Sequence, residues 1–231
     1  MNVNLVTPNP GFVDLLENPT QLIVVDANFY LPPDRQKVGA KYRYSFEEYL
    51  NAWIEPMHKN FPNIAIHEAV LAELVDAQAA QFAQNCIQAN PPTLRLLRDS
   101  DLTKEEAAIR QTKEKIIAAY TKYDPCRDNK DDRGEVKSLA HMGAVGYLYF
   151  STHDSNALRL VEEAEKLKTT LDEIQAIHFY EGIYYLTKNG NMDRVFARNL
   201  YRYDYYFTKR EKLVNPSWEE FCTGMDKLYH L

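Results

Sequence analysis

Residues 134–167 read GEVKSLAHMGAVGYLYFSTHDSNALRLVEEAEKL, and this stretch decides the fold class. Its pattern predicts a helix over 134–146, a strand over 147–151 and a second helix over 155–167. Far upstream, residues 21–26 read QLIVVD, a β-rich apolar run ending in an acid, which is typical of a fully buried parallel strand. Strands that alternate with helices predict an α/β fold with a central, mainly parallel sheet covered by helices.

Between these strands the sequence predicts further helices. Ser45 and Glu48 have the spacing of a capping box at the start of a helix over 45–59. Apolar residues recur with a helical period over 67–84. Thr103 is followed by the acidic first turn expected of another helix. These segments read as helical additions to the α/β core.

The C-terminal part of the chain has a uniformly helical pattern. It begins after Thr170 and is broken at 189–191 (NGN) and at 215–216 (NP). We expect one α/β domain with helical insertions over residues 1–180, followed by a helical extension over 181–231 that packs on it.

Composition excludes some classes of protein. The chain has 231 residues, with 27 basic and 33 acidic side chains and a net charge of −6, which excludes a uniformly basic protein that coats nucleic acid. Its cysteines, Cys86, Cys126 and Cys222, are odd in number and widely spaced, so neither a disulfide framework nor a thiolate zinc site is expected, and Cys86 and Cys222 read as buried apolar residues. No signal-peptide pattern opens the sequence and no long apolar span follows. We expect a soluble, cytoplasmic protein.

Four acids are placed where they can converge. Asp26 and Asp154 come just after predicted parallel strands, whose carboxyl ends form the ligand crevice of such sheets. Glu73 and Glu135 lie on predicted helices at the border of their apolar faces. Converging carboxylates repel one another unless cations lie between them, and hard oxygen ligands favour Mg²⁺ or Mn²⁺. The pattern therefore predicts a Mg²⁺ or Mn²⁺ site that could activate water against a phosphodiester.

The same acids carry a family resemblance. Four segments, in this order, resemble the acidic signature of PIN-domain nucleases: VVDANFY at 24–30, IHEAVLAEL at 66–74, DRGEVKSLA at 132–140 and FSTHDSNAL at 150–158. The resemblance implies a three-layer α/β/α fold and a metal-dependent ribonuclease, often the toxin of a toxin–antitoxin pair with an antitoxin protein as partner. This chain departs from the compact toxins by insertions at 31–62 and 91–130 and by its helical tail.

Carried over by position, the resemblance makes Asp26, Glu73, Glu135 and Asp154 the catalytic, metal-binding quartet. Asp132 also fits the third acidic position, so it is an alternative metal ligand to Glu135. Asn28 and Thr152 match small polar positions beside the first and last acids, where they could orient a carboxylate or a bound water.

Each acid also has a structural interpretation. Asp26 could accept hydrogen bonds from turn amides, and Glu73 could be a solvated helix residue. Asp132 and Glu135 have the spacing of a capping box. Asp154 could cap the helix that starts at 155.

Three histidines are further candidates for metal ligands or a general base. His67, His141 and His153 lie near these acids in the sequence, but without HExxH spacing a structural role is favoured over a ligand or general base.

Residues 192–212 carry a local charge of +3, and Arg194, Arg198 and Arg202 form a stripe if the segment is helical. With Tyr201 and Tyr205 beside it, the stripe could bind RNA; the alternative is an amphipathic helix with core aromatics and solvated arginines.

The leading hypothesis is a Mg²⁺- or Mn²⁺-dependent endoribonuclease with RNA as substrate. The alternatives are a catalytically silent PIN-like module that binds RNA or a protein, and a structure-specific DNA nuclease. No membrane association is expected, and an oligomer is left open.

Overall fold

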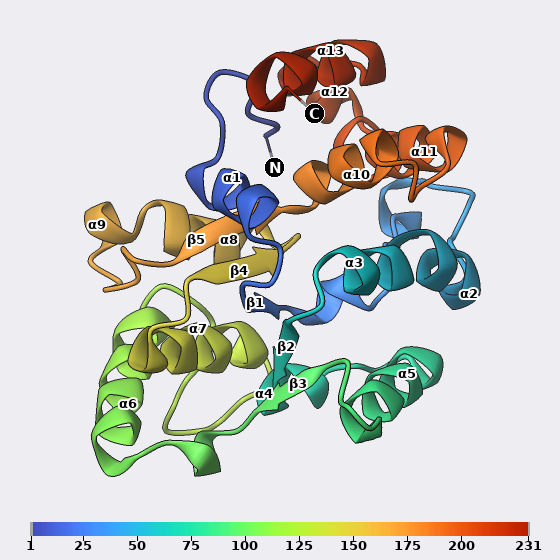
Figure 1. Ribbon diagram of the computed structural model, residues 1–231. Helices are drawn as coiled ribbons and strands as arrows, with labels where there is room; N and C mark the ends of the chain where they lie inside the picture. Colours follow the sequence, from blue (N-terminus) through green and yellow to red (C-terminus); the bar gives the residue numbers. More distant parts are fainter. Residues whose placement is uncertain (1, 231) are drawn as a thin grey trace. The chain divides into compact units, whose positions relative to one another are not determined.

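A computed structural model describes residues 2–230 (Figure 1). The chain divides into two compact units. The first, called here the α/β unit, comprises Thr20–Leu31 and Phe61–Ile177. The second, the helical unit, comprises Pro32–Asn60 together with the described residues up to Pro19 and from His178 onward. The segments before Pro19 and over 32–60 thus cluster with the C-terminal helices.

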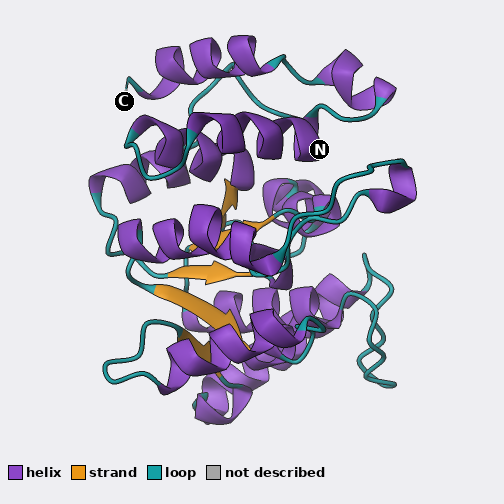
Figure 2. Cartoon of the chain, turned by 90° about the vertical axis from the view of Figure 1, so that its right-hand side faces the viewer, coloured by secondary structure: helices purple, strands orange, loops and turns teal. Residues whose placement is uncertain are grey.

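Five strands form one all-parallel sheet in the order β3-β2-β1-β4-β5 (Figure 1), which confirms the predicted α/β fold class. In Figure 2 these strands are orange and the helices are purple. The strands are β1 (Ile23–Val25), β2 (Ile64–His67), β3 (Arg95–Leu97), β4 (Tyr149–Thr152) and β5 (Gln175–His178). In the central pairings Ile23 lies beside Ile64 on one side and beside Tyr149 on the other. All residues of β1, β2 and β4 are buried, so these strands carry the near-continuous apolar runs of a sheet covered on both faces.

Helices flank the sheet within the α/β unit. They are α4 (Glu68–Leu71), α5 (Ala77–Gln88), α6 (Lys104–Ala118), α7 (Arg133–Val145), α8 (Ser155–Glu162) and α9 (Ala164–Leu167). Thr103 and Glu106 form the capping box that starts α6, as its sequence indicates. Along α7, Val136, Leu139 and Ala140 are fully buried, and α7 packs against α6 and α4. This packing places the first turn of α7 beside the α4–α5 turn.

The helical unit has an aromatic core. Its helices are α1 (Pro10–Glu17), α2 (Phe46–Tyr49), α3 (Glu55–Asn60), α10 (Phe179–Lys188), α11 (Arg194–Tyr205), α12 (Lys209–Val214) and α13 (Trp218–Tyr229). A π-helical turn, η3 (Leu50–Ile54), joins α2 to α3 behind the predicted Ser45–Glu48 capping box. Tyr201 stacks on Phe221 with ring centroids 4.3 Å apart, and Trp53 packs on Phe179 at 5.0 Å. Stacked and tilted rings of this kind add to the free energy of burial.

Three strands were missed by the sequence prediction. β2 and β5 are only four residues long and β3 only three, and each runs directly into a helix or a turn, so a helical period masks them. The prediction of helix from residue 170 to the end is therefore wrong at β5.

The predicted helices over 67–84 and 155–167 are each two helices. The first is interrupted after α4 by a turn that leaves Val75 90% exposed, and Asp76 then caps α5. The second breaks between α8 and α9 at Glu163.

None of the helices in the described range 2–230 combines the length and the apolar character needed to cross a bilayer.

Candidate metal centre at the carboxyl edge of the sheet

Asp26 and Asp154 lie on either side of a topological switch point. From β1 the chain crosses to β2 on one side, whereas β4 pairs with β1 on the other side. In open parallel sheets, ligands bind outside the carboxyl ends of the strands at this point. Asp26 directly follows β1, Asp154 follows β4 by two residues, and the Asp26 amide donates to the Ser151 carbonyl over 3.1 Å. The two acids therefore lie at the same edge of the sheet, close enough for the charge of Asp154 to raise the pKa of Asp26.

Asp26 is buried and held by two polar neighbours. It is 4% exposed, and its Oδ2 accepts hydrogen bonds from Asn28 Nδ2 at 2.6 Å and from Thr152 Oγ1 at 3.1 Å. Burial raises the pKa of Asp26 to about 6, and the charge of Asp154 adds to the rise, while the amides of Ala27 and Asn28 oppose it. Turn amides thus contact Asp26, as its structural interpretation expects, but they do not offset its burial.

Of the acids at this edge of the sheet, Glu135 has the most strongly raised pKa. Its Oε2 is buried and accepts no hydrogen bond from any described residue. Burial raises the pKa of Glu135 to about 9, and the negative charges of Asp26, Asp154, Asp132 and Glu73 raise it further, in that order. This coupling places the carboxylates in one electrostatic neighbourhood. We call Asp26, Glu73, Glu135 and Asp154 the acidic edge site.

The capping-box interpretation of Asp132 and Glu135 is wrong. Asp132 has a φ of 55°, in the left-handed region, and its side chain does not cap α7. Instead its Oδ2 accepts a hydrogen bond from the Lys122 amide at 2.8 Å. Asp132 is therefore engaged in shaping the loop before α7, whereas Glu135 has no capping role.

Glu73 lies in the turn between α4 and α5 and not on a helix. Its Oε1 accepts a hydrogen bond from the Gly134 amide at 2.7 Å, and burial raises its pKa. A Cβ at residue 134 would lie 2.4 Å from Glu73 Oε2, so a side chain there would force the Glu73 carboxyl to shift. The half-buried Glu73 is thus fixed against the first turn of α7 and is not an ordinary solvated residue.

Asp154 caps α8, as its structural interpretation predicts. Its Oδ1 accepts hydrogen bonds from the Asn156 amide at 2.6 Å and the Ala157 amide at 3.0 Å, and its own amide donates to Thr152 Oγ1. Among the described residues, none donates a hydrogen bond to Oδ2. Capping therefore engages one oxygen and leaves the other for a ligand.

A second group, His67, Asp99 and His141, could also bind a metal ion. One ligand atom from each residue lies within 4.8 Å of the others, and both histidines are buried. Within residues 2–230, no three carboxylates of the acidic edge site have oxygen atoms this close to one another. Asp99 was not among the residues singled out in the sequence, although it follows β3 by two residues, just as Asp154 follows β4.

Hydrogen bonds occupy the ligand atoms of this triad. Asp99 Oδ1 lies 3.2 Å from His67 Nε2 and 3.2 Å from His141 Nδ1, and Arg110 Nη2 lies 2.9 Å from Asp99 Oδ2. The Ala69 amide donates to His67 Nδ1 at 3.2 Å, so in a neutral ring the proton is on Nε2. A metal cation bound at His67 Nε2 would have to displace that proton. The cation would also lie near the Arg110 guanidinium, which would repel it.

Asp99→Asn is expected to lower the free energy of unfolding by about 1–3 kcal/mol, because charged hydrogen bonds to buried groups are lost. Although burial opposes it, hydrogen bonds from His141 and His67 and the charge of Arg110 hold the pKa of Asp99 well below its ordinary value of 3.8. The stabilisation is therefore present above about pH 4 and is lost as the pH falls through the folded-state pKa.

Urea unfolding at pH 7 and pH 3 measures this effect. Asp101→Asn, an exposed acid in the same turn, is the matched control and should change stability by less than about 0.5 kcal/mol. Equal effects of the two variants would contradict a stabilising role of Asp99.

The remaining candidates lie elsewhere. Arg194, Arg198 and Arg202 are exposed on α11, but Tyr201 and Tyr205 are fully buried, so those two tyrosines are core residues, as the amphipathic-helix alternative predicts. These residues belong to the helical unit, whereas the acidic edge site belongs to the α/β unit.

His153 and the cysteines have no assigned role at this site. The His153 amide donates to Asn28 Oδ1. Cys86, Cys126 and Cys222 form no disulfide. Cys86 and Cys222 are half-buried, whereas the sequence predicted that they would be buried.

Comparison of the chain with protein-family models, with curated proteins and with solved structures gives no match.

Proposed function

We propose that the protein is a metal-dependent endoribonuclease that binds Mg²⁺ or Mn²⁺ at the acidic edge site. The observation that carries the proposal is Glu135 Oε2, a buried carboxylate oxygen without a hydrogen-bond donor among the described residues, surrounded by other acids. A buried charge of this kind is costly unless a cation compensates it. The all-oxygen donor set fits Mg²⁺ or Mn²⁺, which keep several waters and so do not need every carboxylate in direct contact.

The residues of the acidic edge site would have different roles in binding the cation. Asp26 and Asp154 would hold the cation from the two strand ends, while Glu135 and Glu73 would complete the site from the α7 side. When bound, a divalent cation supplies an activated water and neutralises charge on a scissile phosphodiester. Asn28 and Thr152 both contact Asp26 Oδ2, so they would fix the direction in which the carboxylate presents its other oxygen.

The acidic edge site supports this chemistry better than the triad does. The triad acid already pairs with Arg110, and His67 carries its proton on the ligand atom. At the acidic edge site, no basic side chain of residues 2–230 forms such a pair with Glu135, and the site lies at the switch point of the sheet. The choice of RNA as substrate rests on the resemblance of its four segments to PIN-domain nucleases.

Cleavage assays test the proposal. Fluorescent single-stranded RNA and DNA of the same sequence are incubated with the protein in Mg²⁺, Mn²⁺ or EDTA. We expect cleavage of RNA in Mg²⁺ or Mn²⁺ and none in EDTA. Cleavage of DNA alone would show that the substrate is DNA and not RNA. If neither RNA nor DNA is cleaved, the nuclease proposal is wrong and a protein that only binds its ligand remains.

Thr152→Val is expected to weaken Mn²⁺ binding about 10–100-fold, because a partner that orients a ligand is lost while the volume is kept. Thr169→Val is the matched control, since Thr169 is also fully buried and donates its hydroxyl to the Leu160 carbonyl away from the site. Calorimetric titration with Mn²⁺ measures both. Equal Mn²⁺ affinities in the two variants would show that Thr152 does not contribute to metal binding.

A further inference from the structure

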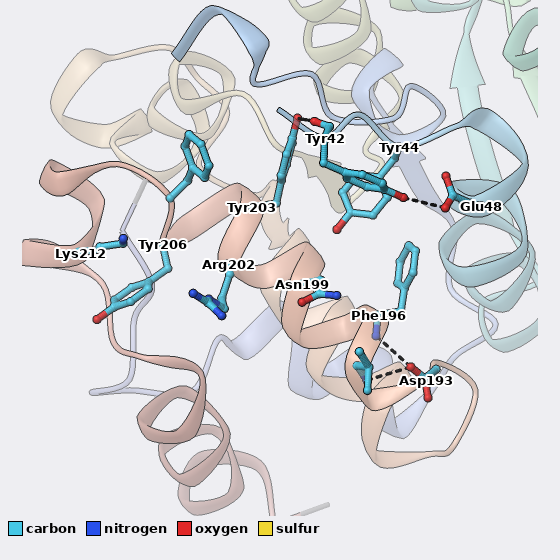
Figure 3. A pocket seen from close by; sticks show the side chains of 12 residues that line it. Tyr42, Tyr44, Glu48, Asp193, Phe196, Asn199, Arg202, Tyr203, Tyr206 and Lys212 are labelled. Atoms are coloured by element: carbon cyan, nitrogen blue, oxygen red, sulfur yellow. Dashed lines mark hydrogen bonds between the residues drawn. The ribbon is translucent and has the colours of Figure 1, made fainter. Parts of the chain in front are cut away.

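A hollow of about 730 Å³ lies on the helical unit and contains no residue of the acidic edge site. It is formed by the 42–48 segment and by residues from the N-cap of α11 to α12, including the turn between these helices (Figure 3). Six aromatic side chains line it: Tyr42, Tyr44, Phe196, Tyr203, Tyr206 and Phe207. We call this hollow the aromatic groove.

Ring packing and hydrogen bonds hold the floor of the aromatic groove. Tyr44 and Tyr203 are buried and meet edge to face, with ring centroids 5.3 Å apart. The Tyr203 hydroxyl accepts a hydrogen bond from the Arg35 amide at 2.9 Å and donates to the Tyr42 carbonyl at 3.0 Å. These bonds tie the 35–42 segment to α11, so the groove is preformed and a ligand need not order it.

The rim presents fixed aromatic rings to solvent. Tyr42 is 50% exposed, and its hydroxyl donates to Glu48 Oε1 at 2.7 Å while its ring meets Tyr44 edge to face. Phe196 is half-buried and tilted against Tyr44 at 5.4 Å. Ordered, partly exposed rings are the platforms on which proteins stack unpaired bases.

Two cations of the groove are available to an anion. Arg202 and Lys212 are exposed lining residues that form no ion pair with any described residue, and Lys212 Nζ lies 5.9 Å from the Tyr206 ring centroid. In Figure 3, Arg202 points from α11 into the hollow, with Tyr206 and Lys212 beside it.

The two acids of the lining are already engaged. Glu48 accepts hydrogen bonds from Tyr42 and Ser45, and Asp193 caps α11 through the amides of Val195 and Phe196. The groove therefore offers stacking surfaces together with uncompensated positive charge.

We propose that the aromatic groove binds a segment of single-stranded RNA, with bases stacked on Tyr42 and Phe196 and phosphates contacted by Arg202 and Lys212. A free nucleotide is the other source of this chemistry, but its phosphates are commonly held by backbone amides of a glycine-rich loop. Here the cations are long side chains on two helices, which suit a continuous phosphate backbone. The choice of RNA over DNA rests on the proposed function, whereas the stacking and phosphate contacts do not.

Fluorescence anisotropy in EDTA tests this proposal without cleavage. The probes are a 12-nucleotide oligouridylate and an abasic ribose-phosphate chain of the same length and charge. We expect the oligouridylate to bind at least about fivefold more tightly than the abasic chain, because stacking contributes per base. Tyr42→Ala and Phe196→Ala should remove most of this difference, and uridine monophosphate at millimolar concentration should not compete.

Matched charge reversals separate the groove from general electrostatics. Arg202→Glu should weaken oligouridylate binding about tenfold or more and reduce its salt dependence. Arg198→Glu, one turn earlier on α11 and outside the lining, should change binding much less. Lys212→Glu and Lys209→Glu form a second such pair on α12.

Equal losses in Arg202→Glu and Arg198→Glu, equal binding of the abasic chain, or full competition by the mononucleotide would each overturn the proposal. Asp26→Asn should bind oligouridylate normally in EDTA. Normal groove-dependent binding without any metal-dependent cleavage would therefore reject the proposed nuclease function alone, and cleavage that persists without groove-dependent binding would reject the groove alone.

Discussion

Replacing Asp26 with asparagine is expected to reduce metal-dependent RNA cleavage by more than about 100-fold, since the loss of a ligand should exceed the 10–100-fold cost of losing a group that orients one. The variant should still fold. Asparagine has the same shape, and its Oδ1 can accept the hydrogen bonds that Asn28 and Thr152 give to Asp26 Oδ2. Because burial already raises the pKa of Asp26 to about 6, a neutral side chain suits the position.

Two further variants serve as comparisons for Asp26→Asn. Asp154→Asn should lose cleavage similarly, because Asp154 lies at the same edge of the sheet and its charge acts on both Asp26 and Glu135. Asp172→Asn removes an exposed acid of the same α/β unit and should keep full activity. Circular dichroism and thermal unfolding establish that all three are folded. Full activity in folded Asp26→Asn would show that the nuclease is not centred on this residue.

Glu135→Gln is expected to abolish cleavage and yet to stabilise the metal-free protein at pH 8. Without a cation, Glu135 must be either protonated or charged beside other acids, as its pKa of about 9 indicates. Glutamine is neutral at every pH, and its amide can donate hydrogen bonds to the neighbouring carboxylates. A residue that only supported the fold would show the opposite effect on stability.

The pH dependence gives this prediction its sign. The pKa of Glu135 is raised from 4.5 to about 9, so between these values the folded protein holds a proton that the unfolded chain has lost. The stability contribution is full below about pH 4.5 and is lost as the pH rises through the folded-state value, with a slope of at most about 1.4 kcal/mol per pH unit.

Urea unfolding in EDTA from pH 5 to pH 9 measures the slope. It should be smaller in Glu135→Gln than in the wild type and unchanged in Glu105→Gln, an exposed position on α6. Added Mn²⁺ should stabilise the wild type and not Glu135→Gln. Identical slopes for the wild type and Glu135→Gln in EDTA would show that the pKa of Glu135 is not raised in the folded protein.

Much of the fold follows from local sequence signals. The helix of residues 133–145 has its apolar residues on one face, and Thr103 with Glu106 announces the start of α6. β1 and β4 were recognisable as apolar runs. β2 was not, because its four residues continue without a turn into α4, so that strand and helix read as one apolar period.

The same limits explain what was missed at the site. Asp26 and Asp154 could be placed because their strands were recognised, and strand ends define the crevice. Asp99 follows β3, a strand of three residues with an exposed Arg95, so the sequence did not mark its end. Its pairing with His67 and His141 joins three distant segments, which only the packed sheet brings together. The aromatic groove likewise depends on tertiary contacts between residues 42–48 and α11.

The most direct test of the metal centre is an anomalous difference map from a crystal soaked in Mn²⁺. We expect a peak within coordinating or water-bridged distance of Asp26, Glu135 and Asp154. A peak confined to His67, Asp99 and His141, or no peak at the acidic edge site at saturating Mn²⁺, would contradict it.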